Sequence, residues 1–182
     1  KHLLGSIVIA TLPIMLAGVW LADMIELYLR DQYVIAISTI LFAVFLLYAD
    51  RTANCKRDEY ALSYGAALLI GCAQIFALVP GASRAGVTMT AALILGCNKA
   101  AAARFSFLLS IPTILAAIAY KSMQLSFAHT QLDWIAIISV FLISGLVAYA
   151  CIKIFVQLVD SIGLLPFVIY RLILGGCLIV FM

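Results

Sequence analysis

The twelve residues 79–90, VPGASRAGVTMT, contain the side chains of this chain that are best suited to chemistry. They combine a proline, two glycines, a serine, an arginine and two threonines within an otherwise very apolar region. Proline lacks a backbone N–H and disfavours helix at the residue before it, so the incoming helix should end at Val79. Gly81 and Gly86 allow a tight turn and a close approach to a ligand. The pattern predicts a helix break that opens onto a ligand.

Ser83 is the predicted N-cap of a new helix that runs through Thr90 towards Cys97. Unpaired N–H groups, the positive end of the helix dipole and the guanidinium of Arg84 would then converge on one point, as in many anion sites. A phosphate or diphosphate fits best, because arginine can bind two of its oxygens at once while Ser83 and Thr88 offer hydroxyls.

The composition places this motif in a membrane protein. Of the 182 residues, 66% are hydrophobic and 10% are charged, whereas soluble proteins average about half and about a quarter. About 20 apolar residues cross a bilayer, so the length allows about six crossings. We expect an all-α, polytopic integral membrane bundle with one domain, residues 1–182, that contacts membrane lipids. The net charge of +3 is small and scattered, which argues against nucleic acid as a partner.

One apolar run, residues 87–97, is too short to cross, because it covers about half of the hydrocarbon thickness. It follows the motif directly, so we predict a broken or re-entrant helix, which membranes tolerate where it lines a protein cavity. The basic loop 51–60 is predicted to be cytoplasmic. The longer apolar runs are 3–21, 33–49, 61–79, 105–120, 134–152 and 164–182.

Two further polar residues lie in apolar segments. Gln74 could face the same cavity as the motif or make a helix–helix hydrogen bond, with equal weight. Arg171 could add positive charge to the site or extend to the membrane interface, and we favour the interface. The motif itself has a structural alternative, a kinked helix whose Arg84 pairs elsewhere. We favour binding, because ionisable groups inside membranes are functional by default.

A faint internal repeat is visible. ATLPIMLAG (10–18) resembles LSIPTILAA (109–117), and residues 33–49 can be aligned with residues 134–150. A duplication, inverted as in many transporters, and chance similarity between apolar segments are equally compatible with this pattern. A duplication would place the first copy's broken helix before Lys1. This and the missing initiator methionine lead us to expect that the chain is the C-terminal part of a longer one.

The segment PGASRAGVT resembles the PGxSRSxxT signature of the undecaprenyl-diphosphate phosphatases, the bacitracin-resistance family of bacterial membrane enzymes. The similarity continues through AARFSFLLSIPTI (102–114) and LLPFVIYRLILG (164–175). The resemblance implies hydrolysis of undecaprenyl diphosphate to undecaprenyl phosphate in the bacterial inner membrane, which recycles the lipid carrier for peptidoglycan synthesis. It also implies an assisting divalent cation, Mg²⁺ or Ca²⁺, and a pocket that opens to the outer face.

Roles follow from the resemblance by position. Arg84 would hold the diphosphate and stabilise charge as the bond breaks, and Ser83 would bind phosphate or act as the nucleophile. These two are the predicted catalytic residues, in keeping with phosphoryl transfer, where positioning and charge stabilisation dominate. The predicted substrate-binding residues are Pro80, Gly81, Ala82, Gly86, Thr88 and Gln74.

The chain departs from the family pattern in two places. Ala85 stands where the family usually has a second serine, and the family's glutamate-rich first motif, with its histidine, has no match here. Those carboxylates are the expected ligands of the cation, so we predict no metal ligand in this chain. We also expect these residues alone to be inactive.

A transporter or flippase for an anionic lipid or substrate is the main alternative, because carriers also bind anions at broken helices. Phosphate release without lipid movement would identify an enzyme. A purely structural membrane subunit is the third reading. The sequence does not distinguish a monomer from a homodimer.

Overall fold

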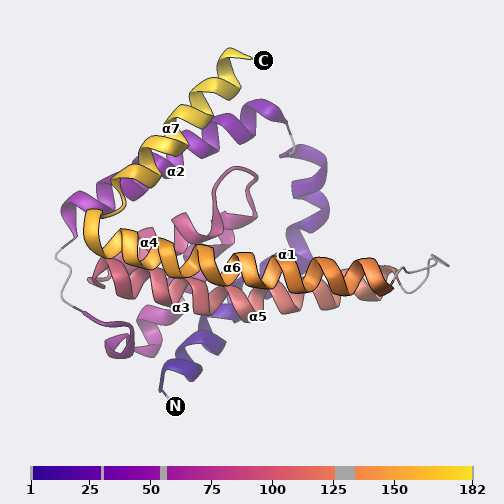
Figure 1. Cartoon of the computed structure of the whole chain (residues 1–182), viewed down its shortest axis with the longest axis horizontal. Helices are drawn as coiled ribbons and strands as arrows, with labels where there is room; N and C mark the ends of the chain where they lie inside the picture. The colour runs from indigo at the N-terminus through magenta and orange to yellow at the C-terminus, as the bar shows by residue number, and fades with distance from the viewer. Residues whose placement is uncertain (1, 30, 54–56, 126–133, 182) are drawn as a thin grey trace.

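The computed structural model describes residues 2–29, 31–53, 57–125 and 134–181. Within these ranges the regular structure is helical, which confirms the predicted all-α fold (Figure 1). The helices are α1 (His2–Tyr28), α2 (Gln32–Thr52), η1 (Glu59–Ala61), α3 (Tyr64–Gln74), η2 (Ile75–Leu78), α4 (Arg84–Ile94), α5 (Lys99–Leu125), α6 (Trp134–Ile162) and α7 (Leu165–Val180).

Four of these helices are long and apolar enough to cross a bilayer, so this is a multi-pass membrane protein. The candidate spans lie in α1, α2, α5 and α6, and they are His2–Leu21, Gln32–Thr52, Lys99–Ser122 and Trp134–Ile162. The chain length allows about six crossings, and the described ranges contain four helices long enough to make one. The apolar runs 61–79 and 164–182 form shorter helices, Tyr64–Leu78 and Leu165–Val180.

The segment from α3 to α4 is a re-entrant hairpin. Its two ends are joined by backbone hydrogen bonds, from the N–H of Arg57 to the carbonyl of Gly96 (3.0 Å) and from the N–H of Asn98 to the carbonyl of Arg57 (2.8 Å). The chain thus enters through α3, turns at residues 79–83 and returns through α4 to the end where it began. The sequence predicted a broken or re-entrant helix, and this geometry corresponds to the re-entrant form.

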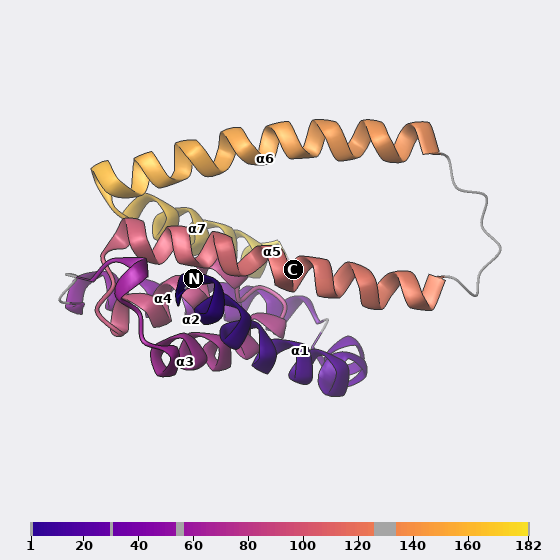
Figure 2. The same ribbon diagram turned by 90° about the horizontal axis from the view of Figure 1, so that it is seen from below.

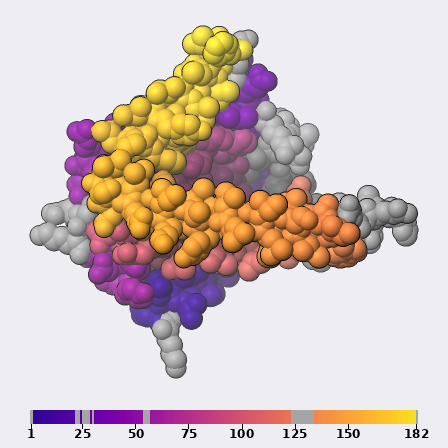
Figure 3. All heavy atoms as spheres, in the orientation of Figure 1, coloured from indigo at the N-terminus to yellow at the C-terminus, as the bar shows by residue number. Residues whose placement is uncertain are grey.

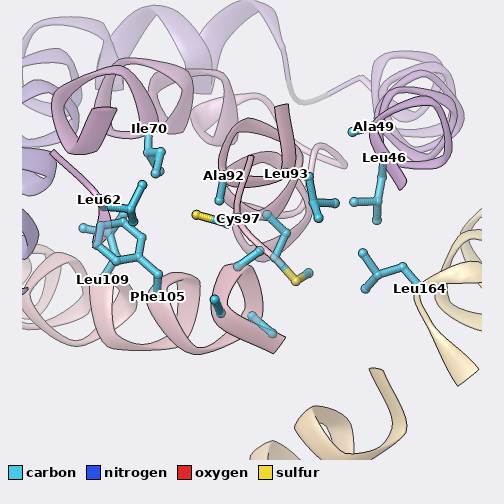
Figure 4. Packing of buried hydrophobic residues seen from close by; sticks show 14 of the residues in the cluster. Leu46, Ala49, Leu62, Ile70, Ala92, Leu93, Cys97, Phe105, Leu109 and Leu164 are labelled. Atoms are coloured by element: carbon cyan, nitrogen blue, oxygen red, sulfur yellow. The ribbon is translucent and has the colours of Figure 1, made fainter. Parts of the chain in front are cut away.

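The hairpin is the centre of the hydrophobic core, which Figure 4 shows from close by. Ile70 of α3 and Leu93 of α4 are fully buried with Phe105 and Leu109 of α5. On its other side, a Cβ added to Gly71 would collide with the backbone of Ala10, so α1 and α3 approach closely. The hairpin is therefore packed within the bundle, and its turn at residues 79–83 is half-buried apart from Ala82, which is fully buried.

Helix α7 runs beside α2, as Figure 1 shows. A Cβ on Gly175 would lie within 3.3 Å of the carbonyl oxygen of Ala36, which is a close helix–helix approach. Helix α6 differs: it stands away from α5 over much of its length (Figure 2), and its side chains form an exposed ridge (Figure 3). Residues 134–154 of this helix are all exposed, and Val159 is its one buried residue among those described. This apolar helix thus offers most of its surface to its surroundings.

The helices that carry the faint repeat are similar in length. Both α1 and α5 have 27 residues and a proline inside, Pro13 and Pro112. Each is followed by a helix that is a candidate span, α2 and α6. The duplication itself stays a prediction.

Candidate active site

The turn of the hairpin is built by backbone conformations that few residues tolerate. Gly81 has φ of 89°, and a Cβ there would collide with the carbonyl oxygen of Ile35 and the hydroxyl of Ser38. Both the conformation and the space require glycine. Because α2 is so close to the turn, the backbone of residues 79–83 is held from one side.

Ser83 is the N-cap of α4, as predicted. Its Oγ accepts a hydrogen bond from the N–H of Gly86 (3.3 Å), and its carbonyl accepts from the N–H of Val87 (3.0 Å). Its φ of 64° is the only positive value for a residue other than glycine in the described ranges. Such a conformation costs about 1–3 kcal/mol and persists where the surroundings enforce it, often at functional sites.

Side chains from α2 and α7 bind three of the carbonyl groups of the turn. The hydroxyl of Ser38 donates to the carbonyl of Pro80, and that of Thr39 lies 3.2 Å from the carbonyl oxygen of Gly81. From α7, Nη2 of Arg171 donates to the carbonyls of Gly81 (2.7 Å) and Ala82 (3.0 Å). These three acceptors are therefore occupied by neighbouring helices.

Three consecutive backbone donors, where the turn meets α4, are left without partners. Among the described residues, the backbone N–H groups of Ser83, Arg84 and Ala85 have no acceptor. A helix start with unpaired N–H groups attracts anions, both through hydrogen bonds and through the helix dipole. The occupied carbonyls and unpaired amides together give the turn the polarity of an anion site.

Arg84 is the first residue of α4 and is partly exposed. Within the part of the chain that the structure describes, its guanidinium makes no hydrogen bond or ion pair; the ion pairs there join Lys99 to Asp50 and Arg104 to Glu59. The kinked-helix alternative, in which Arg84 pairs with a carboxylate, has no support among these residues. The charge of Arg84 is available to a ligand.

Two predicted substrate-binding residues pack against α5 instead of lining the turn. Oγ1 of Thr88 lies 2.6 Å from the hydroxyl of Ser106, and Nε2 of Gln74 donates to Thr113 (3.1 Å). For Gln74 this is the helix–helix hydrogen bond that the sequence left open, although its buried Oε1 has no partner among the described residues. Their contact with substrate stays a prediction, whereas residues 80–84 and Gly86 do meet at one place.

The sequence-based placement of Arg171 at the membrane interface is wrong. The side chain is 3% exposed and reaches the turn, because α7 packs on α2 and points this residue inward. Ser38, Thr39 and Ser106 were missed entirely. Short hydroxyls in apolar helices usually bond to their own helix, and Thr39 does so as well, so the sequence carries no signal that separates them.

An apolar groove of about 700 Å³ lies beside the turn, between α2 and the hairpin. Val79 and Val87, on either side of the turn, belong to it. Its other walls are almost wholly apolar and include Leu41, Phe45 and Phe76. The groove therefore places a surface suited to a hydrocarbon chain next to the proposed anion site.

The site residues do not fit a metal ion. Across the described ranges, no group of three or more His, Cys, Asp or Glu side chains is close enough to hold one. The turn supplies N–H donors and guanidinium groups, which repel cations, rather than the oxygen ligands that Mg²⁺ and Ca²⁺ require.

Comparisons with known proteins agree with the motif. The family model described as bacitracin resistance protein BacA matches residues 1–177. The chain is 47% identical to undecaprenyl-diphosphatase 1 of Pseudoalteromonas translucida, over 97% of this chain and 66% of that protein. It is also 47% identical to undecaprenyl-diphosphatase of Chromohalobacter salexigens, over 96% and 66% of the two chains. The chain thus spans about two thirds of the length of these relatives.

Proposed function

Because this chain belongs to the bacitracin resistance protein BacA family, we propose that it hydrolyses undecaprenyl diphosphate to undecaprenyl phosphate and phosphate. The observation that carries the proposal is the start of α4, where unpaired N–H groups lie beside an arginine without a partner. The names of the similar proteins support the choice of substrate. In a bacterial inner membrane this reaction would recycle the lipid carrier for peptidoglycan synthesis and give resistance to bacitracin.

The terminal phosphate binds at the turn. Its oxygens accept hydrogen bonds from the unpaired N–H groups of residues 83–85, and the guanidinium of Arg84 binds two oxygens at once. The hydroxyl of Ser83 accepts from Gly86, so its own hydrogen is free to donate to phosphate. The isoprenyl chain extends into the apolar groove that begins at Val79 and Val87.

Hydrolysis breaks the bond between the terminal phosphorus and the bridging oxygen. Water adds its oxygen to that phosphorus and loses a proton to the solvent, and the lipid monophosphate leaves with the bridging oxygen. Negative charge on the phosphoryl oxygens is stabilised by fixed N–H groups and Arg84, which need no rearrangement during the reaction. Among the described residues, no carboxylate or imidazole is hydrogen-bonded to Ser83, so we assign Ser83 to phosphate binding rather than to nucleophilic attack.

The family resemblance also implies an assisting divalent cation. No step above uses it, because the described residues contain no group of three or more His, Cys, Asp or Glu side chains that could hold one. Treatment of the natural protein with a chelator, followed by return of Mg²⁺ or Ca²⁺, tests whether phosphate release requires it. A homodimer likewise stays a prediction, which the mass of the purified protein in detergent tests.

Substitution of Arg84 tests the proposal. In the natural protein, we expect Arg84→Ala to lower the turnover of a long-chain isoprenyl diphosphate by about 10²–10³-fold, the usual effect of removing a donor that stabilises developing charge. Arg84→Lys keeps the charge but not the paired contact, so it should recover only part of the rate. Arg51→Ala, at the exposed end of α2, is the control. Unchanged turnover in a folded Arg84→Ala protein would reject the proposal.

Proteoliposomes separate this reaction from transport. We expect phosphate release that does not depend on movement of the labelled lipid between leaflets. Lipid movement without phosphate release would favour the flippase alternative, whose support is the re-entrant hairpin with its adjoining apolar groove.

A further inference from the structure

Arg171 is a buried cation that the proposed reaction does not yet use. Its side chain is 3% exposed, and its guanidinium carbon lies 6.0 Å from the ring centre of Phe167. Nη2 is occupied by two carbonyls of the turn, while Nη1 is buried and has no partner among the described residues. A buried charge is costly unless an opposite charge compensates it.

The free nitrogen lies against the first turn of α4. A Cβ added to Gly86 would lie 2.7 Å from Nη1, so the guanidinium packs directly against this glycine. Gly86 is two residues after Arg84 in the same helical turn. The guanidinium of Arg171 and the positive end of the α4 dipole therefore meet at the hairpin turn, and Arg84 is the first residue of the same helix. This accumulation of positive charge is unfavourable without an anion.

No acidic side chain in the described ranges is paired with either arginine. The described ion pairs of Asp50 and Glu59 are with Lys99 and Arg104. The excess positive charge at the turn is thus left for a ligand. Because Coulomb attraction is proportional to the product of the charges, a ligand with more negative charge gains more from each added cation.

We propose that Arg171 is a positioning residue that makes the site selective for the diphosphate over the monophosphate. This inference rests on the proposed function. Arg171 holds the carbonyls of Gly81 and Ala82 away from the ligand, and its charge attracts the more negative headgroup more strongly. A phosphate monoester carries about −1.5 to −2 charges near pH 7, and the diphosphate ionises further. Loss of the terminal phosphate therefore weakens binding and favours release of the product.

The test compares two ligands in the natural protein, reconstituted in nanodiscs. The measured quantities are the KM and kcat for an isoprenyl diphosphate and the inhibition constant of the matching isoprenyl monophosphate. The variants are Arg171→Met, which removes the charge and the donors, and Arg171→Lys, which keeps the charge without the two-carbonyl contact. Arg51→Met is the control, because Arg51 is exposed at the end of α2. Thermal unfolding shows whether each variant is folded.

In Arg171→Met, we expect the KM for the diphosphate to rise by about tenfold or more, the usual scale for hydrogen bonds to charged groups. The inhibition constant of the monophosphate should rise by a clearly smaller factor. The ratio of the monophosphate inhibition constant to the diphosphate KM, which measures the selectivity, therefore falls. In Arg171→Lys the ratio should stay close to that of the unchanged protein, while kcat falls because the turn is less well held. The control should change none of these values.

Equal weakening of both ligands in Arg171→Met would overturn the inference, because a purely structural role predicts an unchanged ratio. If Arg171→Met does not fold, the lysine variant decides: a ratio that falls despite the retained charge also overturns it. A different measurement tests the proposed function: absence of phosphate release from the unchanged protein would reject it. In that case, inorganic pyrophosphate and phosphate serve as the paired ligands, and equal affinities for both would reject selectivity by charge.

Discussion

Among single residues, Ser83 combines a role of its side chain with a role of its backbone. Its hydroxyl caps α4, and its backbone holds φ of 64°, which bulkier residues avoid. The same conformation leaves its N–H and those of the next two residues without acceptors. Strain at this position is thus part of what makes the anion site.

A pair of substitutions at Ser83 separates the cap from the chemistry. Ser83→Gly relieves the strain and costs the cap a few tenths of a kcal/mol, whereas Ser83→Ala keeps the strain and costs about 0.5–2 kcal/mol. We expect the alanine variant to unfold at the lower temperature. Both lose the hydroxyl, so both should release phosphate about 10–100-fold more slowly, as for a lost hydrogen bond to a charged group.

Initial rates and thermal unfolding of the two variants, side by side, check this prediction. Turnover that drops to the uncatalysed level in both would show that Ser83 is the nucleophile. Rates that instead follow stability, with glycine near the unchanged protein, would show that the hydroxyl serves only as a cap.

The sequence predicts this site well where local chemistry decides and poorly where packing does. Proline, glycine and serine rules place the turn and the N-cap without any structure, and both are confirmed. Arg171 was misplaced because the interface rule assumes lipid around the helix, whereas α7 points this residue at the turn. That contact depends on the packing of α7 against α2. The two helices meet where Gly175 approaches Ala36, and these residues are far apart in the sequence.

At the scale of elements, the hairpin depends on close backbone contact with α1. Gly71 lies against the backbone of Ala10, where an added Cβ would have all its nearest contacts below 3.0 Å. Backbone atoms cannot move aside as the end of a flexible side chain can. Helix α1 thus supports α3 and, through it, the position of the turn.

Two glycines of α3 form a matched pair for testing this contact. We expect Gly71→Ala to destabilise the protein by about 1–3 kcal/mol, the usual cost of overpacking. Gly65→Ala meets nothing within 4 Å, so it should be neutral or gain up to about 1 kcal/mol from helix propensity. Unfolding by heat or denaturant in one detergent compares them. Equal stabilities would contradict the close approach of α1 and α3.

The hairpin also shows that an apolar run does not by itself predict a membrane crossing. Run 61–79 is mostly apolar, and the sequence alone left open whether it crosses the membrane. In the structure its helices end at Leu78, and α4 then runs back to the end where α3 began. Arg57, before α3, is hydrogen-bonded to Gly96 and Asn98, which follow α4 in the chain. Re-entry is set by that pairing between segments about 40 residues apart in the sequence, and no local pattern reports it.

At the scale of the whole molecule, paired charges gather at the end where the hairpin begins. Arg104, near the start of α5, binds Glu59 just before α3, at 2.8 Å. Lys99 binds Asp50 at the end of α2, at 2.7 Å. Asp160, near the end of α6, lines the same polar cleft as Lys99. These contacts place the end of α2, both ends of the hairpin, the start of α5 and the end of α6 on one side of the membrane.

Single cysteines at three exposed positions test this topology, in a background whose native cysteines are replaced by alanine. Tyr60 and Asp160 lie at the charged end, while Lys121 is 22 residues beyond Lys99 along α5, or about 33 Å at 1.5 Å per residue. We expect a membrane-impermeant thiol reagent to label Tyr60→Cys and Asp160→Cys from the same side and Lys121→Cys from the other. The basic loop before Tyr60 predicts that the shared side is the cytoplasm. If the hairpin instead crossed the membrane, Tyr60→Cys would be labelled from the same side as Lys121→Cys. That result would contradict a hairpin that enters and leaves the membrane on one side.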